Sequence, residues 1–278
     1  MSKKIKFFLR FLRFYWNAQT SYRIHSPFVF EFAREILDDQ RTFYAFPVLE
    51  RLRSSLLRNR TTVEITDYGA GSKVKRGDER SIRELVKHSA TSPFFCRVLF
   101  KTINAYQPLN ALELGTSVGI SSLYQAAGLG TGGRLITLEG CPEIARIAAE
   151  NIEMADVHNI DLRVGTFAET LVPALKDLQR LDYVFIDGNH RRVPTLEYFE
   201  TCLLYAHETS IFVLDDIHWS EEMEAAWQTI QQHPRVSLTI DLFACGLVFF
   251  RPQNKTKLHY QLVANRYKPW QMGFFRAR

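Results

Sequence analysis

The stretch "LELGTSVGISS", residues 112–122, decides the fold of this chain. A short apolar segment runs into a turn that holds Gly115 and Gly119, and the turn passes directly into a helical pattern. Further along, "LITLEG" places Glu139 at the end of the next apolar segment, 26 positions after Glu113. In nucleotide-binding α/β proteins an acid at this place accepts hydrogen bonds from ribose hydroxyls. The stretch therefore predicts a strand, a cofactor-binding turn and a helix.

Apolar segments and helical patterns alternate on both sides of this stretch, from about residue 92 onward. The expected strands are "NALELG", "RLITLEG", "IDLRVG", "LDYVFIDG" and "SIFVLDD", each followed by an amphipathic segment. Buried strands separated by crossover helices are typical of a doubly wound parallel sheet. The last pair, "VSLTIDLF" and "GLVFFRP", has only Ala244 and Cys245 between its members, so these two strands must be antiparallel neighbours. We predict an α/β, Rossmann-like fold.

Three regions are expected along the chain. Residues 1–91 form an N-terminal helical and substrate-cap region, residues 92–252 form the cofactor-binding domain, and residues 253–278 form a basic and aromatic tail. In the first region, "HSPFVFEFAREILDD" predicts a turn at Ser26-Pro27 followed by a helix, and "FPVLERLRSSLLRNR" predicts a second helix. This region lacks a parallel-strand rhythm and is expected to be helical.

The composition bounds the classes of protein that this chain can belong to. Its 278 residues are 46% hydrophobic and carry a net charge of +5, which allows one substantial core and is only a mild basic excess. We therefore expect a small-molecule partner rather than nucleic acid. The cysteines lie far apart, without C-x-x-C or paired histidine spacing, so no zinc knuckle or disulfide framework is indicated and a reducing cytoplasm fits. They are Cys96, Cys141, Cys202 and Cys245.

The first sixteen residues, "MSKKIKFFLRFLRFYW", predict a basic amphipathic helix. Arg10 and Arg13 interrupt the apolar run that a secretion signal needs, and no stretch of the chain has the roughly 20 apolar residues of a membrane span. Two interpretations of its apolar stripe are open. The stripe packs on the domain behind it, or residues 3–16 dock on an anionic membrane surface, peripheral on the inner face. The stripe consists of Ile5, Phe8, Leu9, Leu12, Tyr15 and Trp16.

A second glycine turn, "DYGAGS" at residues 67–72, also resembles the end of a strand. The charged segment that follows leads to a helix, and we expect no second strand and no acid at the required distance. This turn is therefore not the cofactor turn. Either its backbone N–H groups, backed by Lys73, Lys75, Arg76 and Arg80, bind an anionic group of a substrate, or the turn is a solvated surface loop.

The spacing of Gly115 and Gly119 distinguishes among cofactors. The nicotinamide fingerprint G-x-G-x-x-G is absent, and so is the G-K-[ST] of a phosphate-binding loop. The pattern E-x-G-x-x-x-G-x-S suits a ligand that has an amino acid and a nucleoside but no phosphates. It indicates S-adenosylmethionine.

Residues 92–251 resemble class I S-adenosylmethionine-dependent methyltransferases. The strings "LELGTSVGISS", "LITLEGCPEIARIAAENI", "LDYVFIDGNH" and "VLDDIHW" are similar to those of O-methyltransferases of the catechol and caffeoyl-CoA type and of their macrolide-sugar relatives. The "HSPFVF" opening and the "DYGAGS" turn are similar to those of uncharacterised bacterial methyltransferase-like proteins. The resemblance implies a seven-stranded sheet of order 3-2-1-4-5-7-6 with the last strand antiparallel.

The resemblance also implies the residues of the cofactor site. The turn residues would surround the methionine part, Glu139 would bind the ribose, and residues 165–169 would line the adenine pocket. The whole set expected to contact the cofactor is Glu113, Gly115, Thr116, Ser117, Gly119, Ser121, Glu139, Gly140, Thr166, Phe167, Ala168 and Asp187.

Methyl transfer to an oxygen needs a group that removes the proton of the hydroxyl. In the cation-dependent relatives, the positions of Asp187 and Asp215 bind magnesium, and Asp216 stands where those proteins have an asparagine. Either these three acids bind Mg²⁺, or they orient loops and touch the amino group of the cofactor. His190 matches the position of a lysine base in the catechol enzymes, and His218 is the rival candidate for the same role.

These residues together predict a cytoplasmic enzyme that methylates a hydroxyl of a small or lipid-like molecule, with a homodimer left open. Two alternatives are also open. One is a methyltransferase that acts on RNA or protein, although "IDGN" replaces the amino-methylating signature [DN]-P-P-[FY] after the fourth strand and no RNA module is visible. The other is a membrane-held protein that binds the cofactor without catalysis.

Overall fold

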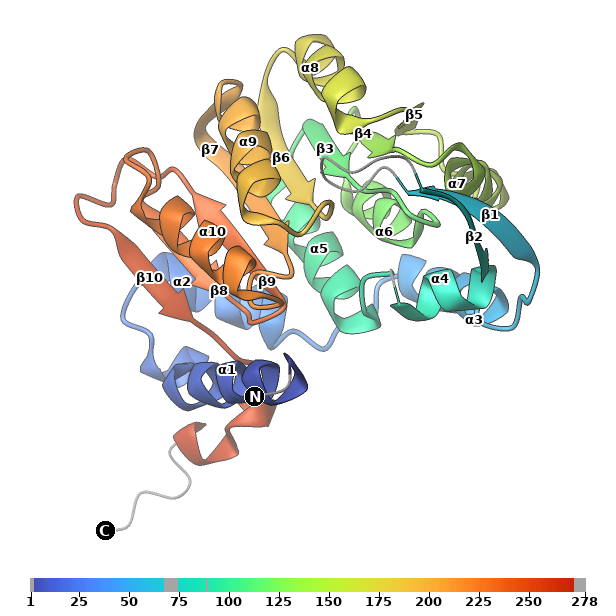
Figure 1. Cartoon of the computed structure of the whole chain (residues 1–278). Coiled ribbons are helices and arrows are strands. Elements are labelled where there is room, and N and C mark those ends of the chain that lie inside the picture. Colours follow the sequence, from blue (N-terminus) through green and yellow to red (C-terminus); the bar gives the residue numbers. More distant parts are fainter. Residues whose placement is uncertain (1–2, 68–74, 89, 273–278) are drawn as a thin grey trace. The chain divides into compact units, whose positions relative to one another are not determined.

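The computed structural model of the chain contains an eight-stranded sheet (Figure 1). The structure describes residues 3–67, 75–88 and 90–272. The strands of this sheet are β3 (Asn110–Leu114), β4 (Arg134–Glu139), β5 (Ile160–Val164), β6 (Leu181–Ile186), β7 (Ala206–Asp215), β8 (Leu238–Asp241), β9 (Cys245–Phe249) and β10 (Leu258–Gln261). Their order is β10-β8-β9-β7-β6-β3-β4-β5, and a helix follows each strand from β3 to β7, as in doubly wound folds.

This arrangement confirms the predicted order of the strands. β3 to β9 take the places 1 to 7 of the predicted 3-2-1-4-5-7-6 sheet, and β9 pairs antiparallel with both β7 and β8. The predicted number of strands is wrong, because β10 adds an eighth strand that runs parallel to β8 at the sheet edge. Its sequence, "LHYQ", is short and contains no apolar run, so the segment was expected to be part of a tail.

The helices begin at capping signals that are visible in the sequence. The Ser26 side chain accepts a hydrogen bond from the Val29 N–H, and Pro27 occupies the first turn of α2, as predicted. Thr166 and Glu169 form a capping box at the start of α8. The α-helices are α1 (Lys3–Asn17), α2 (Pro27–Phe32), α3 (Ala45–Leu56), α4 (Ile82–His88), α5 (Pro93–Tyr106), α6 (Ile120–Gly128), α7 (Pro142–Met154), α8 (Phe167–Leu178), α9 (Arg192–Leu203) and α10 (Glu221–Gln232). Short helical turns lie at η1 (Ser21–Arg23), η2 (Ala33–Leu37), η3 (Asn265–Tyr267) and η4 (Pro269–Met272).

The chain divides into two compact units. The α1 unit holds Met1–Arg41, His190–Glu197 and Glu208–Arg278, and the β3 unit holds Thr42–Asn189 and Tyr198–His207. The cofactor turn and all residues expected to bind the cofactor therefore belong to the β3 unit. The three-region division of the chain stays a prediction.

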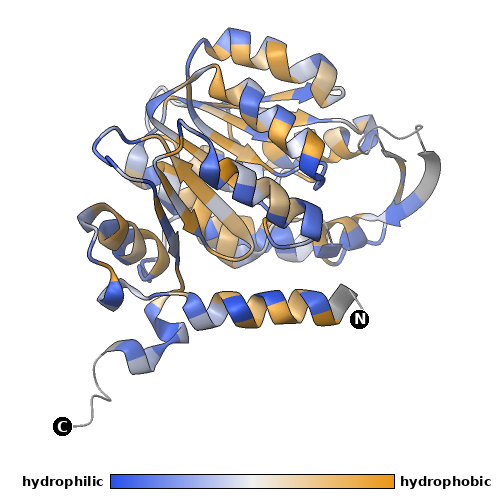
Figure 2. Ribbon diagram, turned by 60° about the vertical axis from the view of Figure 1, so that its left-hand side comes forward, coloured by the Kyte–Doolittle hydropathy of each residue, from blue (hydrophilic) through white to orange (hydrophobic). Residues whose placement is uncertain are grey.

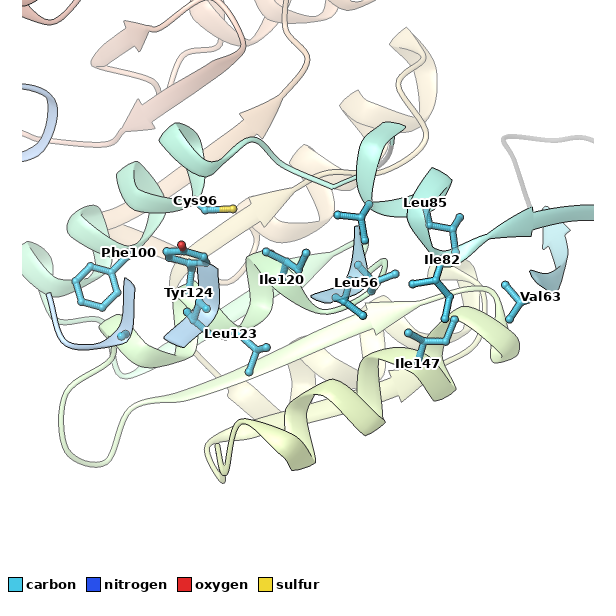
Figure 3. Packing of buried hydrophobic residues seen from close by; sticks show 14 of the residues in the cluster. Leu56, Val63, Ile82, Leu85, Cys96, Phe100, Ile120, Leu123, Tyr124 and Ile147 are labelled. Atoms are coloured by element: carbon cyan, nitrogen blue, oxygen red, sulfur yellow. The ribbon is translucent and has the colours of Figure 1, made fainter. Parts of the chain in front are cut away.

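The core of the β3 unit joins the segment before the sheet to the helix after the cofactor turn (Figure 3). Leu56 of α3 and Leu85 of α4 lie in one buried cluster with Ile120 and Leu123 of α6. Both α3 and α5 pack on α6. Full burial of a side chain of this size contributes about 1.5–3 kcal/mol relative to exposure. Residues that precede the sheet therefore help to hold α6, and with it the cofactor turn, in place.

A β-hairpin interrupts the N-terminal region that was expected to be helical. β1 (Thr62–Asp67) pairs antiparallel with β2 (Lys75–Ser81), so the expectation that no second strand follows "DYGAGS" is wrong. Val63 and Ile65 of β1 are buried, whereas β2 reads "KRGDERS" and has no apolar residue. The alternation that reveals a strand is therefore missing from β2. Residues 68–74, which hold most of the second glycine turn, lie outside the described residues.

The N-terminal helix α1 is confirmed, and of the two interpretations of its apolar stripe, packing on the domain behind it is wrong. Phe7, Phe11 and Phe14 contact Phe243 at ring-centroid distances of 5.3, 5.1 and 5.3 Å. The predicted stripe instead faces outward, apart from the half-buried Tyr15, with exposed fractions of 50% for Ile5, 57% for Phe8, 47% for Leu9, 44% for Leu12 and 86% for Trp16. Figure 2 shows apolar and polar residues mixed along α1. The sequence places apolar residues on two faces of this helix, and the aromatic face is the one that packs.

Burial also decides the chemistry of the cysteines. Cys96, Cys141, Cys202 and Cys245, which all lie among the described residues, are buried thiols that form no disulfide. Burial raises the pKa of the Cys202 and Cys245 thiols, which makes them poor nucleophiles. Among the described helices, none is both long and apolar enough to cross a bilayer.

Candidate active site

The turn between β3 and α6 is shaped by glycine. Gly115 has a φ of +101° and Gly119, which caps α6, has a φ of +83°, both in the region that favours glycine. The Gly115 N–H donates to the Leu138 carbonyl of the neighbouring β4 at 2.9 Å. A Cβ on Gly115 would lie 2.0 Å from the backbone oxygen of Asp187. The absence of a side chain at Gly115 therefore lets the ends of β3 and β6 meet.

Glu139 ends β4 beside this turn, as the sequence predicts. One oxygen of its carboxylate accepts the Ser117 N–H at 2.8 Å, and the other accepts the Cys141 N–H at 2.9 Å. Burial raises the pKa of Glu139, although hydrogen bonds from the backbone of Cys141, Ser117 and Gly140 oppose this shift. A carboxylate has about four acceptor positions, so a carboxylate fixed by these backbone donors can still accept from a ligand. The geometry fits a residue that binds the hydroxyls of a ribose.

Glu113 lies beneath the turn rather than along it. Its side chain is fully buried on β3 and accepts hydrogen bonds from Ser122, from Gln125 at 2.6 Å and from Thr137 at 2.6 Å. Thr137 also bonds to the hydroxyl of Thr116, in the turn, at 2.6 Å. Burial raises the pKa of Glu113, and hydrogen bonds from Ser121, Ser122, Thr137 and Gln125 oppose the shift. Glu113 therefore belongs to a buried polar network that supports the turn, and the expected contact of Glu113 and Ser121 with the cofactor stays a prediction.

Sequence reasoning missed three members of this network, namely Ser122, Gln125 and Thr137. Ser122 and Gln125 lie on α6 and Thr137 lies on β4, all fully buried. Their spacing carries no motif, because polar residues on a helix are usually read as its exposed face. The one available signal was the unusually apolar context of β3, in which a charged residue needs buried partners.

The start of α8 forms a second wall near the sheet edge. Gly165 has a φ of +146°, and the Thr166 side chain is held in the capping box with Glu169. The Phe167 ring packs directly on Gly188, since a Cβ added to Gly188 would lie only 2.5 Å from a carbon of this ring. The Phe167 ring also contacts the Tyr198 ring edge-on, at a centroid distance of 5.3 Å. Ala168 is exposed in the first turn of the helix. This contact places Phe167 against the segment that follows β6.

Asp187, which follows β6, is reached by a residue that sequence reasoning missed. The Thr91 hydroxyl lies 3.4 Å from an Asp187 carboxylate oxygen, and the Asp187 N–H donates to the Leu114 carbonyl at 2.9 Å. The buried Arg53 guanidinium donates to the Thr91 carbonyl at 2.7 Å, which fixes this segment. Residues that precede α5 therefore lie beside the carboxyl end of β6, where ligands bind in open parallel sheets.

His190 faces Asp216 in the α1 unit. The distance from His190 Nδ1 to an Asp216 carboxylate oxygen is 3.8 Å, and both side chains are about one third exposed. Burial raises the pKa of Asp216, and the charge of His190 opposes this shift. Asp216 adopts a left-handed backbone with a φ of +53°, directly after Asp215 at the end of β7. An imidazole next to a carboxylate, with part of its ring accessible, can accept a proton.

His218, the rival candidate, is held between two carboxylates. Its Nδ1 lies 3.1 Å from Glu224 and its Nε2 lies 2.9 Å from Asp241, and its ring stacks on Phe243 at 5.1 Å. Burial lowers the pKa of His218, but the hydrogen bonds and charges of Asp241 and Glu224 outweigh it, and the net shift is upward. A carboxylate oxygen at each ring nitrogen favours a ring that donates from both nitrogens. The expected role of His218 as the base stays a prediction.

The three acids expected to bind magnesium do not stand out as a ligand cluster. Within residues 3–67, 75–88 and 90–272, no three His, Cys, Asp or Glu side chains are grouped to hold a metal ion. Asp187, Asp215 and Asp216 supply the hard oxygen donors that Mg²⁺ prefers. Their expected role as ligands stays a prediction.

Comparison with known proteins agrees with this geometry. Residues 112–217 match the family described as "Methyltransferase domain". The chain is 34% identical over 113 residues to a catechol O-methyltransferase of Niastella koreensis, covering 40% of this chain and 50% of that protein. It is 32% identical over 114 residues to a catechol O-methyltransferase of Mycobacterium tuberculosis, covering 41% and 50%. The matched stretch thus spans about half the length of these relatives.

The fold is also found among solved structures. An O-methyltransferase of Bacillus cereus, solved in complex with S-adenosylhomocysteine, superposes with a TM-score of 0.54 at 20% identity, over 76% of this chain and 92% of that one. At this identity the likeness concerns the fold alone.

Proposed function

We infer that this chain, which carries a class I S-adenosylmethionine-dependent methyltransferase domain of the O-methyltransferase kind, transfers a methyl group from S-adenosylmethionine to a hydroxyl oxygen of a small or lipid-like molecule. The observation that carries this proposal is the braced Glu139 carboxylate beside a turn whose Gly115 leaves no room for a side chain. An acid on one strand end and a glycine turn on the next are what a nucleoside joined to an amino acid requires.

The β3 unit would hold the cofactor through groups that are already fixed. Glu139 would accept the ribose hydroxyls, and the turn from Gly115 to Gly119 would leave space for the methionine part. Phe167 would lie against the adenine. The buried Glu113 network would keep the turn in one conformation, which reduces the ordering that binding demands.

The proposed acid–base chemistry rests on His190. When bound, S-adenosylmethionine supplies an electrophilic methyl carbon on a sulfonium. His190 would accept the hydroxyl proton of the substrate as the oxygen–carbon bond forms and the carbon–sulfur bond breaks. Asp216, next to His190, would stabilise the imidazolium that results. Asp187 lies three positions before His190 and would orient the substrate or the cofactor.

The proposal includes a divalent cation that Asp187, Asp215 and Asp216 would bind. If these acids bind Mg²⁺, the ion would lower the pKa of a substrate hydroxyl and reduce the demand on the histidine. The methyl-transfer activity is measured with Mg²⁺ and again after a chelator has removed it. Loss of activity supports the metal-assisted reaction, and unchanged activity supports a reaction that needs the histidine alone.

The test of the proposed function separates binding from catalysis. Isothermal titration with S-adenosylhomocysteine measures cofactor binding in the wild-type chain and in Glu139→Ala. Transfer of a labelled methyl group to a panel of catechols, other phenols and lipid-like alcohols then measures the reaction. We expect binding that Glu139→Ala weakens, and a methyl ether as product. Binding without transfer to any hydroxyl would leave a cofactor-binding protein, and no binding would overturn the proposal entirely.

A further inference from the structure

The N-terminal helix α1 carries two apolar faces, and only one of them is used inside the protein. The aromatic face packs on Phe243, and Arg10 on the same side bonds to Glu224 at 2.7 Å. These contacts fix the helix on the α1 unit. The face of α1 that is turned away from Phe243 is exposed on the surface of this unit.

The second face is a continuous apolar stripe. Its members occupy positions i, i+3, i+4, i+7 and i+11, which share one side of a helix. Their exposed fractions run from 44% to 86%, far above those of core residues in the same unit. Scattered exposed apolar residues are ordinary, but five on one helix face form a patch that marks a binding surface. The stripe comprises Ile5, Phe8, Leu9, Leu12 and Trp16.

Basic and aromatic residues border the stripe. Arg13 and Lys6 are exposed in the helix turns beside it, and Lys6 forms an ion pair with Glu221 at 2.8 Å. At its C-terminal end, Trp16 is 86% exposed, and Trp270 is 53% exposed and lies against Tyr15 at 6.4 Å. Apolar residues flanked by cations, with tryptophan at the margin, form the pattern of a helix that lies in the plane of a membrane interface.

We propose that the outward stripe of α1 inserts into the surface of an anionic lipid bilayer, with Arg13 at the level of the headgroups. The charge of Arg13 favours this occupant over a second copy of the chain. Two copies that joined through the stripe would place the Arg13 guanidinium of each along the same contact, and like charges repel. An anionic surface instead meets Arg13 with the opposite charge.

The experiment uses the purified full chain and vesicles. Flotation with phosphatidylcholine vesicles is compared with flotation on vesicles that contain about one third phosphatidylglycerol, at low and high salt. The test variant is Leu9→Gln/Leu12→Gln, and the matched control is Leu204→Gln, since Leu204 is 80% exposed outside α1. Thermal melting confirms that each variant is folded. Brominated lipids report insertion by quenching tryptophan fluorescence, and Trp16→Phe shows how much of the quenching comes from Trp16 rather than from Trp270.

We expect flotation with the anionic vesicles that weakens at high salt. The Leu9→Gln/Leu12→Gln variant should bind about tenfold more weakly or worse, whereas Leu204→Gln should match the wild type. The proposal is overturned by absence of flotation, by equal flotation of wild type and double variant, or by a dimer in solution that the double variant dissociates. None of these outcomes touches methyl transfer, because the vesicle assay contains no methyl donor.

Discussion

Replacing Gly115 by alanine tests whether the meeting of β3 and β6 governs the cofactor site. The new Cβ would lie 2.0 Å from the backbone oxygen of Asp187, whereas real Cβ contacts stay above 3.0 Å. The backbone of Gly115 or of Asp187 must therefore move by at least the difference, 1.0 Å. The left-handed backbone adds a strain of about 1–2 kcal/mol, and overpacking adds about 1–3 kcal/mol. We expect the unfolding free energy of Gly115→Ala to fall by about 2–5 kcal/mol, as measured by urea denaturation.

A matched control separates backbone strain from the clash. Gly132 has a φ of +83° and nothing within 4 Å of its would-be Cβ, so Gly132→Ala should show the strain alone, about 1–2 kcal/mol. Titration with S-adenosylhomocysteine should show affinity lowered by about tenfold or more in Gly115→Ala and unchanged in Gly132→Ala. If the two variants lose the same stability and keep the same affinity, the close approach of Gly115 to Asp187 does not shape the site.

Three further predictions concern single side chains. Glu139→Gln should weaken S-adenosylhomocysteine binding by about tenfold to one hundredfold, because the side-chain amide cannot accept hydrogen bonds from both backbone donors. Titration calorimetry measures the affinity, and an unchanged affinity would show that Glu139 is not part of the cofactor site. His190→Ala should lower kcat by about 10²- to 10⁴-fold with cofactor affinity retained, and a full kcat in the methyl-transfer assay would place the base elsewhere. His218→Gln should lower the unfolding free energy by about 1–3 kcal/mol at acidic pH. Because the folded state raises the pKa of His218, its contribution to stability is complete below the unfolded pKa near 6.5 and is lost as the pH rises through the folded pKa. Urea unfolding should therefore show that the difference in unfolding free energy between wild type and His218→Gln shrinks at alkaline pH.

The fold could be predicted where apolar periodicity and chain connectivity act together. The two residues between the last predicted strands, Ala244 and Cys245, leave no room for a crossover, and β8 and β9 are antiparallel neighbours. The strands that were missed, β2 and β10, are short or highly polar and lie at edges, where little apolar surface is buried. Periodicity also identified α1 as a helix but could not say which of its two apolar faces packs, because that depends on Phe243 in a distant turn.

The candidate site could be predicted where the backbone demands a particular residue type. Gly115 and Glu139 follow from a turn and a strand end, and both lie where expected. The position of Glu113 beneath the turn could not be predicted, since the E-x-G spacing does not say which side chains of α6 and β4 will surround it. The state of His218 depends on Asp241, 23 positions away, and no local pattern links the two.

The buried cysteines give this protein a practical advantage. Because all four native thiols are enclosed, a maleimide dye added to the folded wild-type chain has no exposed cysteine to attack. A single cysteine introduced at an exposed position, such as Leu204, would then be the sole accessible labelling point without any prior removal of native residues. Fluorescent reporters can therefore be attached one at a time to follow ligand and vesicle binding in an otherwise unaltered background.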